Sequence, residues 1–158
     1  MSRIATRPCT PDDAADMHRL DQVCFDAPFS FERTTFDILL ERPGAVSLAA
    51  VHPKQGVVGF IIVEPFSADA TIVSTIDVHP DWRRRGIGRR LLHDALGQAT
   101  ARGLFKSYLQ VYVGNVGAIA FYRRLGYRMV KLLPSFYGEG IDGYLMFLDF
   151  RTVAGIAP

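Results

Sequence analysis

Cysteines and long apolar runs are scarce in this chain. Its 158 residues include two cysteines, Cys9 and Cys24. Two cysteines provide neither a disulfide framework nor the paired spacing of a zinc site, so we expect no metal and interpret both as buried thiols in a reducing compartment. The longest apolar stretch, around Phe60, is far shorter than the roughly 20 residues that cross a membrane. Because the first residues also lack an apolar signal segment, we expect a soluble, cytoplasmic protein without a membrane partner.

An excess of charge of one sign is also missing. Lys and Arg number 18 against 16 Asp and Glu, which gives a formal net charge of +2. The basic residues gather at 83–90 and 123–128 and do not coat a face, a pattern that favours a local anion over a nucleic acid partner. The hydrophobic content of 49% is that of a globular protein. We expect one domain over residues 1–151 and a frayed tail over 152–158.

The most informative stretch runs from Thr71 to Ala101. A β-branched strand ends at Val78, a turn rich in arginine and glycine follows, and an amphipathic helix begins at Ile87. The unpaired amides and the dipole at a helix start favour an anion, and glycines remove the Cβ atoms that would keep it away. The residues assigned to this phosphate or pyrophosphate cradle are Arg83, Arg84, Arg85, Gly86, Ile87, Gly88 and Arg89. A glycine turn that merely lets the helix pack closely remains the alternative.

Around this stretch, hydrophobic periodicity predicts the order βααβββαβαββ. Strands are expected at 4–7, 46–51, 57–63, 71–78, 105–113, 127–133 and 142–150. Helices are expected from Thr10 to about Cys24, from a cap at Ser30 to just before Pro43, from 87 to 101 and from 115 to about 125. This order predicts an α/β (α+β) protein with a mixed sheet and helices on both faces.

Two motifs in this order resemble the cofactor motifs of the GNAT acetyltransferases. The spacing Arg-x-x-Gly-x-Gly after a strand ending in Val-x-Pro is similar to their coenzyme A loop. Dinucleotide and Walker loops are excluded, because the third glycine of the first and the Gly-Lys-Ser/Thr of the second are absent. The stretch from Asn115 through Tyr122 to Gly126-Tyr127 is similar to the family's second motif.

The resemblance implies the GNAT fold, in which a mostly antiparallel sheet is splayed at its middle strands and acetyl-CoA lies in the opening. The pantetheine arm would then pair with the backbone of Ile76, Asp77 and Val78, and the Val78 amide would hold the thioester oxygen as charge builds on it. Asn115 and Tyr122 are two helical turns apart and share a face. Asn115 offers a donor and an acceptor to the amide-bearing arm, and Tyr122 could hand a proton to the leaving thiolate, since ordinary phenol and thiol pKa values are close. A helix cap and a core residue are the alternative interpretations.

A finer resemblance is to the N-terminal protein acetyltransferases, including the RimI-like enzymes. The loop 24–30, which holds Phe29, and the hairpin 134–146, which holds Tyr137, are similar to the segments that contact the substrate in those enzymes. Phe136 stands where a second tyrosine is usual. The resemblance implies that Phe29 and Tyr137 bind substrate.

The general base of these enzymes is missing at the positions where it is expected. Gln110 stands where RimI-like enzymes carry glutamate, and Ile72 and Ser74 occupy the central strand where other members place Glu or His. Glu64 is the candidate base that remains, acting through a water and with Ser74, although a solvated charge at a strand end is the alternative. His79 is a weaker candidate.

The missing base favours an acceptor that needs little help to lose its proton. An α-amine has a pKa of about 8, whereas deprotonating a lysine at pH 7 costs roughly 4–5 kcal/mol. We therefore expect an N-acetyltransferase that modifies peptide or protein N-termini by direct attack in a ternary complex, as a monomer or homodimer. A small-molecule amine acetyltransferase and a non-catalytic acyl-CoA-binding regulator are the alternatives.

Overall fold

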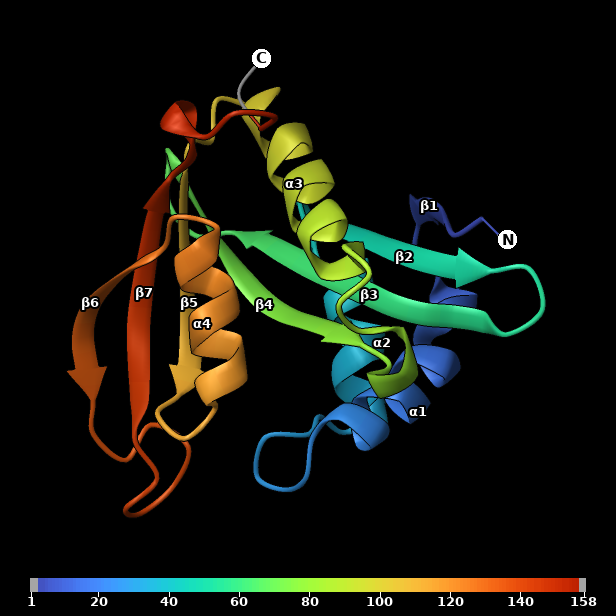
Figure 1. Cartoon of the computed structure of the whole chain (residues 1–158), viewed down its shortest axis with the longest axis horizontal. Helices are drawn as coiled ribbons and strands as arrows, with labels where there is room; N and C mark the ends of the chain where they lie inside the picture. Colours follow the sequence, from blue (N-terminus) through green and yellow to red (C-terminus); the bar gives the residue numbers. More distant parts are fainter. Residues whose placement is uncertain (1–2, 157–158) are drawn as a thin grey trace.

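The computed structural model describes residues 3–156, which form one seven-stranded sheet with helices on both faces (Figure 1). The strands are β1 (Ala5–Pro8), β2 (Val46–His52), β3 (Gly56–Pro65), β4 (Ala70–Val78), β5 (Lys106–Tyr112), β6 (Arg128–Leu133) and β7 (Gly143–Asp149). The α-helices are α1 (Ala14–Cys24), α2 (Arg33–Glu41), α3 (Ile87–Thr100) and α4 (Val116–Arg124), and the 3-10 helices are η1 (Pro11–Asp13), η2 (Pro80–Trp82) and η3 (Phe150–Thr152). The predicted order of strands and α-helices is confirmed.

The sheet is splayed at its middle, as expected. Its strand order is β1-β2-β3-β4-β5-β7-β6, and every neighbouring pair is antiparallel except β4 and β5. These two parallel strands pair only where Ala70–Ile72 meets Lys106–Tyr108. Beyond that short contact the two strands diverge, and we call the separation between the remaining parts of their backbones the opening (Figure 1).

Each face of the sheet has its own apolar core. Helix α3 packs on β2, β3 and β4 on one face, while α1 packs on β3 and β4 from the other. Side chains alternate along β3, so Ile61 joins the core beneath α3 whereas Phe60 and Ile62 join the core of α1 and α2. The apolar face of the predicted amphipathic helix α3, which includes Leu91 and Ala95, is buried against the sheet.

Three local expectations are wrong. Helix α2 begins at Arg33 after Glu32, not after a cap at Ser30, because the preceding loop is held elsewhere: the Phe31 amide donates to the Asp21 carboxylate at 2.6 Å. The tail is not frayed throughout, since Ile156 is only 4% exposed and belongs to the main core; residues 157–158 lie outside the described residues.

The cysteines are half-buried and not fully buried as expected. Desolvation raises the pKa of Cys9 to about 12 and that of Cys24 to about 11, so both thiols stay protonated. Among residues 3–156, no helix has both the length and the apolar character needed to span a bilayer.

Candidate functional site

The turn before α3 has the backbone of an anion-binding loop. Gly86, at the N-cap of α3, has a φ of 79°, and Arg84 has a φ of 58°, both in the left-handed region. The amides of residues 86–89 donate to no acceptor within the described part of the chain. These four groups are the orphan donors of a helix start, and with the helix dipole they favour a negatively charged ligand.

The two glycines of this turn have different roles. A Cβ at Gly86 would have no atom within 4 Å, so space does not require glycine here. Glycine is favoured at this position because the backbone is left-handed. A Cβ on Gly88 would lie 3.2 Å from the Phe121 ring of α4. Gly88 therefore allows α3 and α4 to pack closely, which is the alternative that the sequence left open.

The arginines of the turn are not all free to meet a ligand. The Arg83 side chain donates from Nε to the Val78 carbonyl at 2.9 Å, and the Arg85 guanidinium lies 4.7 Å from the Trp82 ring centroid. Cation–π stacking of this kind holds Arg85 over the 3-10 turn and leaves its charge near the loop. Arg83 and Arg85 thus bring positive charge to the turn through contacts that also order it.

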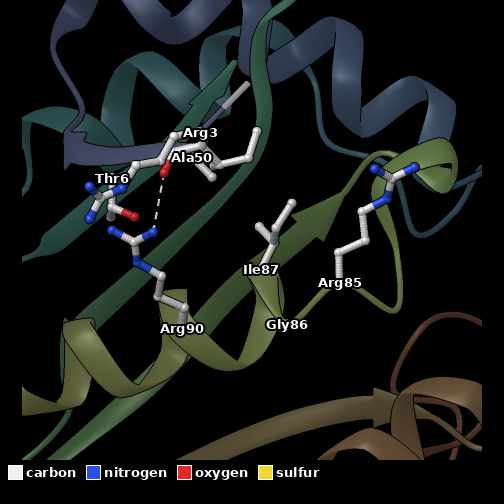
Figure 2. Close-up of a pocket in the computed structure, with 8 residues that line it drawn as sticks. Arg3, Thr6, Ala50, Arg85, Gly86, Ile87 and Arg90 are labelled. Carbon is white, nitrogen blue, oxygen red and sulfur yellow. Dashed lines mark hydrogen bonds between the residues drawn. The ribbon is translucent and has the colours of Figure 1, made fainter. Parts of the chain in front are cut away.

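A cavity of about 200 Å³ lies beside the start of α3, on the side of β1 and β2 (Figure 2). Arg3, Thr6 and Arg90 line one end, and Arg90 donates to the Ile4 carbonyl at 3.2 Å. Figure 2 shows Arg85 pointing away from Arg90, so the two do not converge on one point. The cavity is smaller than the roughly 300–1,000 Å³ of a ligand pocket, so it does not accommodate a whole coenzyme A.

The edge of β4 that borders the opening carries backbone groups without a strand partner. The His79 amide donates to the Val58 carbonyl of the neighbouring chain segment at 2.9 Å. Because hydrogen-bonding directions alternate along an antiparallel strand, Ile76 and Val78 direct their N–H and C=O groups to the opposite edge, toward the opening. Such an edge can pair with an extended, amide-bearing chain. The Val78 carbonyl already accepts from Arg83, so the free groups are those of Ile76 and the Val78 amide, and these fit the pantetheine arm of coenzyme A.

Tyr122 of α4 has a buried ring and an available hydroxyl. The residue is 8% exposed, and its hydroxyl makes no hydrogen bond within residues 3–156, yet it is not among the fully enclosed polar atoms. Burial, reinforced by Tyr127, Asp77 and Tyr137, raises the pKa of Tyr122 well above its ordinary value. The close match of phenol and thiol pKa values expected from the sequence is therefore lost. Tyr122 remains a hydrogen-bond donor at every physiological pH.

Asn115 acts as a helix cap. Its side-chain oxygen accepts from the Ala118 amide at 3.2 Å, which satisfies one orphan donor at the start of α4. The acceptor that the sequence assigned to the cofactor is thus already engaged. The Asn115 side-chain NH₂ remains as the group that can serve a ligand.

Three aromatic side chains from distant segments meet at the open end of the sheet. Phe29, from the loop between α1 and α2, stacks on Tyr112 at the end of β5 with ring centroids 4.7 Å apart. Tyr137, from the loop between β6 and β7, lies edge-on to Phe29 at 5.1 Å. The structure therefore brings the two predicted substrate residues together. The sequence analysis did not identify Tyr112. Its signal in the sequence is the glycine two residues later: a Cβ at Gly114 would overlap the Tyr112 ring, so the aromatic residue requires glycine there.

Glu64 is not the solvated strand-end charge that the sequence left as an alternative. It is 8% exposed, and its Oε1 accepts from Arg42 at 2.6 Å while its Oε2 accepts from the Ser74 hydroxyl. Ser74 lies at the bulge where the register of β3 and β4 shifts. Both carboxylate oxygens are therefore hydrogen-bonded to side chains of this protein.

The other base positions match the sequence interpretation. Gln110 is half-buried on β5 opposite Leu145 of β7 and provides no carboxylate. His79 accepts the Asp81 amide on Nδ1 at 3.1 Å, as part of the turn that follows β4. Neither side chain offers a base in this arrangement.

Known proteins are similar to this chain in sequence and in fold. The model of the Acetyltransferase (GNAT) family matches residues 14–127. An uncharacterized protein of Mycobacterium leprae is 33% identical over 143 residues, which cover 87% of this chain, although the chain spans only 38% of that protein. The [ribosomal protein bS18]-alanine N-acetyltransferase of Salmonella typhimurium is 31% identical over 119 residues, covering 75% of this chain and 77% of the relative. The crystal structure of Arabidopsis thaliana NAA60 in complex with acetyl-CoA has the same fold, with a TM-score of 0.80, 24% identity and coverage of 92% and 98% of the two chains.

Proposed function

Because this chain belongs to the GNAT acetyltransferase family, we propose that it transfers an acetyl group from acetyl-CoA to the α-amine of peptide or protein N-termini. The observation that carries this proposal is the continuity of the open β4 edge with the unpaired amides of residues 86–89. An extended arm on that edge leads directly to a diphosphate on the helix start. Acetyl-CoA supplies an activated thioester; the residues of this chain supply its orientation and the surrounding hydrogen bonds.

Each residue at the opening has a role in this proposal. The Val78 amide donates to the thioester oxygen, where negative charge grows during attack by the amine. The Tyr122 hydroxyl donates to the sulfur, and its high pKa keeps it a donor, not a competing anion. The backbone amides and side-chain charges of Arg83 to Arg89 hold the diphosphate. The Asn115 side-chain NH₂ donates to the amide-bearing arm. Attack is direct, because no cysteine in this region is activated: the pKa of Cys24 is raised, not lowered.

The substrate class rests on two supports. The named Salmonella relative acetylates an alanine N-terminus of a ribosomal protein, and it matches three quarters of this chain. The Phe29, Tyr112 and Tyr137 rings form an aromatic surface that suits a peptide, whereas a polyamine site would be markedly acidic. We further propose that the protein works in the cytoplasm, as a monomer or homodimer, in keeping with its two free cysteines.

Release of coenzyme A with a matched peptide panel tests the proposal. One peptide carries a free N-terminus and no lysine, a second carries a blocked N-terminus and one lysine, and free amines form the third arm. We expect turnover with the first at least tenfold above the others, since the lysine costs more to deprotonate. Preference for a free amine would support the small-molecule alternative. Acetyl-CoA binding without release for any acceptor would support the non-catalytic regulator.

A further inference from the structure

Two buried carboxyls lie on β4 and on the helix α1 that packs on it, and neither side chain has a role in the function proposed above. Asp77 of β4 and Asp21 of α1 are each 1% exposed. The Asp77 Oδ1 accepts from the Thr75 hydroxyl at 2.7 Å, and the Asp21 Oδ2 accepts from the Phe31 amide at 2.6 Å. The remaining oxygens, Asp21 Oδ1 and Asp77 Oδ2, are buried without a hydrogen-bond partner within residues 3–156, and the two carboxyl groups are near enough to influence each other.

Physical chemistry limits the protonation state of such a pair. An unpaired buried carboxylate is costly, and two adjacent carboxylates cannot both ionise cheaply, so one shared proton satisfies both free oxygens. In agreement, burial raises the pKa of both groups, and the Asp21 charge raises that of Asp77 further. The pair titrates as a unit, with one carboxyl charge remaining to accept a second proton.

The position of the pair connects it to the reaction. Asp77 lies between Ile76 and Val78, whose backbone groups face the opening, and its negative charge contributes to the raised pKa of Tyr122. Thr75 is half-buried on the part of β4 that has left β5. Because its hydroxyl hydrogen is directed at Asp77, its oxygen lone pairs are free to accept from a ligand. The other titratable or charged groups that face the pair are His18, Cys24, Arg83 and Tyr122.

We propose that the Asp21–Asp77 pair accepts the proton of the attacking amine through the Thr75 hydroxyl. The amine nitrogen forms its bond to the thioester carbon, and the C–S bond breaks with its electron pair on sulfur, where Tyr122 donates a hydrogen bond. The proton lost by nitrogen passes to the Thr75 oxygen as the Thr75 hydrogen passes to Asp77 Oδ1. The pair then holds two protons and returns one to solvent. This inference rests on the proposed function, and it fills the place of the base that Gln110 cannot provide.

The first test needs no substrate. The infrared spectrum of the cofactor-free protein at pH 7 should contain the C=O stretch of a protonated carboxylic acid. Asp77→Asn and Asp21→Asn should each remove this band, whereas Asp13→Asn, which alters a buried but arginine-paired carboxylate, should leave it. Absence of the band in the wild type, or its persistence in both pair variants, would overturn the shared proton.

The second test is kinetic. Asp77→Asn should lower kcat about 100-fold or more, the usual contribution of general acid–base catalysis, with acetyl-CoA affinity retained. We expect the wild-type pH profile to have an acidic limb, and Asp77→Asn should remove it. Thr75→Val, which lacks the hydroxyl, should also lower kcat and remove the limb, whereas Thr75→Ser, which keeps it, should retain both. Asp13→Asn should keep the wild-type profile.

Several outcomes would refute specifically the proton transfer through Thr75 to the Asp21–Asp77 pair, which we call the relay. Wild-type kcat and pH profile in Asp77→Asn would exclude the pair as acceptor. Loss of the limb in Glu64→Gln or His18→Gln, with its retention in Asp77→Asn, would assign the proton to that residue instead. A wild-type enzyme that acetylates no N-terminus would refute the proposed function, whereas an active wild type with an unaffected Asp77→Asn refutes only the relay.

Discussion

Replacing either of two neighbouring tyrosines by phenylalanine should give opposite phenotypes. The ring centroids of Tyr122 and Tyr127 are 5.6 Å apart, and each variant removes one hydroxyl from the same buried region. The Tyr122 hydroxyl has no partner within the described residues, so Tyr122→Phe should leave the free energy of unfolding nearly unchanged. If that hydroxyl donates to the departing sulfur, its loss removes a hydrogen bond to a charged group, about 1.5–3 kcal/mol, which lowers kcat about 10- to 150-fold.

Tyr127 supplies the matched control. Its hydroxyl lies 2.6 Å from the Ser107 Oγ, and both residues are buried, so Tyr127→Phe leaves the serine oxygen unsatisfied. That costs about 1–3 kcal/mol of stability and lowers Tm by about 2–12 °C in a chain of this size, with little change in kcat below the Tm. Thermal unfolding and coenzyme A release, measured on both variants, separate the effects. Unchanged kcat in Tyr122→Phe would refute its role at the sulfur, and a large loss of Tm there would show that the hydroxyl is structural.

Three further changes test other parts of the structure. Gly86→Ala places a Cβ at a φ of 79°, so it should cost about 1 kcal/mol and weaken acetyl-CoA binding measured by calorimetry; unchanged affinity would contradict the loop assignment. Phe29→Ala should raise the KM for peptide without changing acetyl-CoA affinity, because its ring packs against Tyr112 and Tyr137 of the aromatic surface; equal losses in both would argue against a substrate role. The hydrogen bonds from Arg7 hold the pKa of Asp13 below its usual value, so this pair stabilises the fold above the unfolded-state pKa and ceases to do so as pH falls through the folded-state pKa. Arg7→Met should therefore lower Tm at pH 7 but progressively less as pH falls below the unfolded-state value, and a loss that stays constant across that range would show that packing dominates.

Local pattern was enough to predict the elements, because each leaves a periodic trace in the sequence. The α3 stripe repeats at helical spacing, and the β-branched run before the glycine turn has no other reasonable structure. The start of α2 was misplaced because its cause is not local. The Phe31 amide is held by Asp21, ten residues earlier, so the loop continues past Ser30, whose hydroxyl would otherwise cap a helix.

The site was only partly predictable for the same reason. Arg83 to Gly88 are contiguous, so the loop could be read directly from the chain. The aromatic surface draws on three segments, and Tyr112 was missed because its ring partners, Phe29 and Tyr137, lie far from it in the sequence. The Asp21–Asp77 pair joins residues 56 positions apart, on α1 and β4, and nothing in the local sequence of α1 distinguishes Asp21. An aspartate on a helix is expected at the surface unless a partner across the helix–sheet interface is known.

The three-residue join between β4 and β5 makes the sheet resemble a book with two leaves and a short spine. One leaf carries β1 to β4 under α3, and the other carries β5 to β7 beside α4 (Figure 1). Along the spine, the Thr71 hydroxyl adds one bond to the Lys106 carbonyl at 3.2 Å. A ligand that lies between these two parts and binds only the folded chain would connect them a second time. At 100 times its Kd it should raise the free energy of unfolding by about 2.7 kcal/mol.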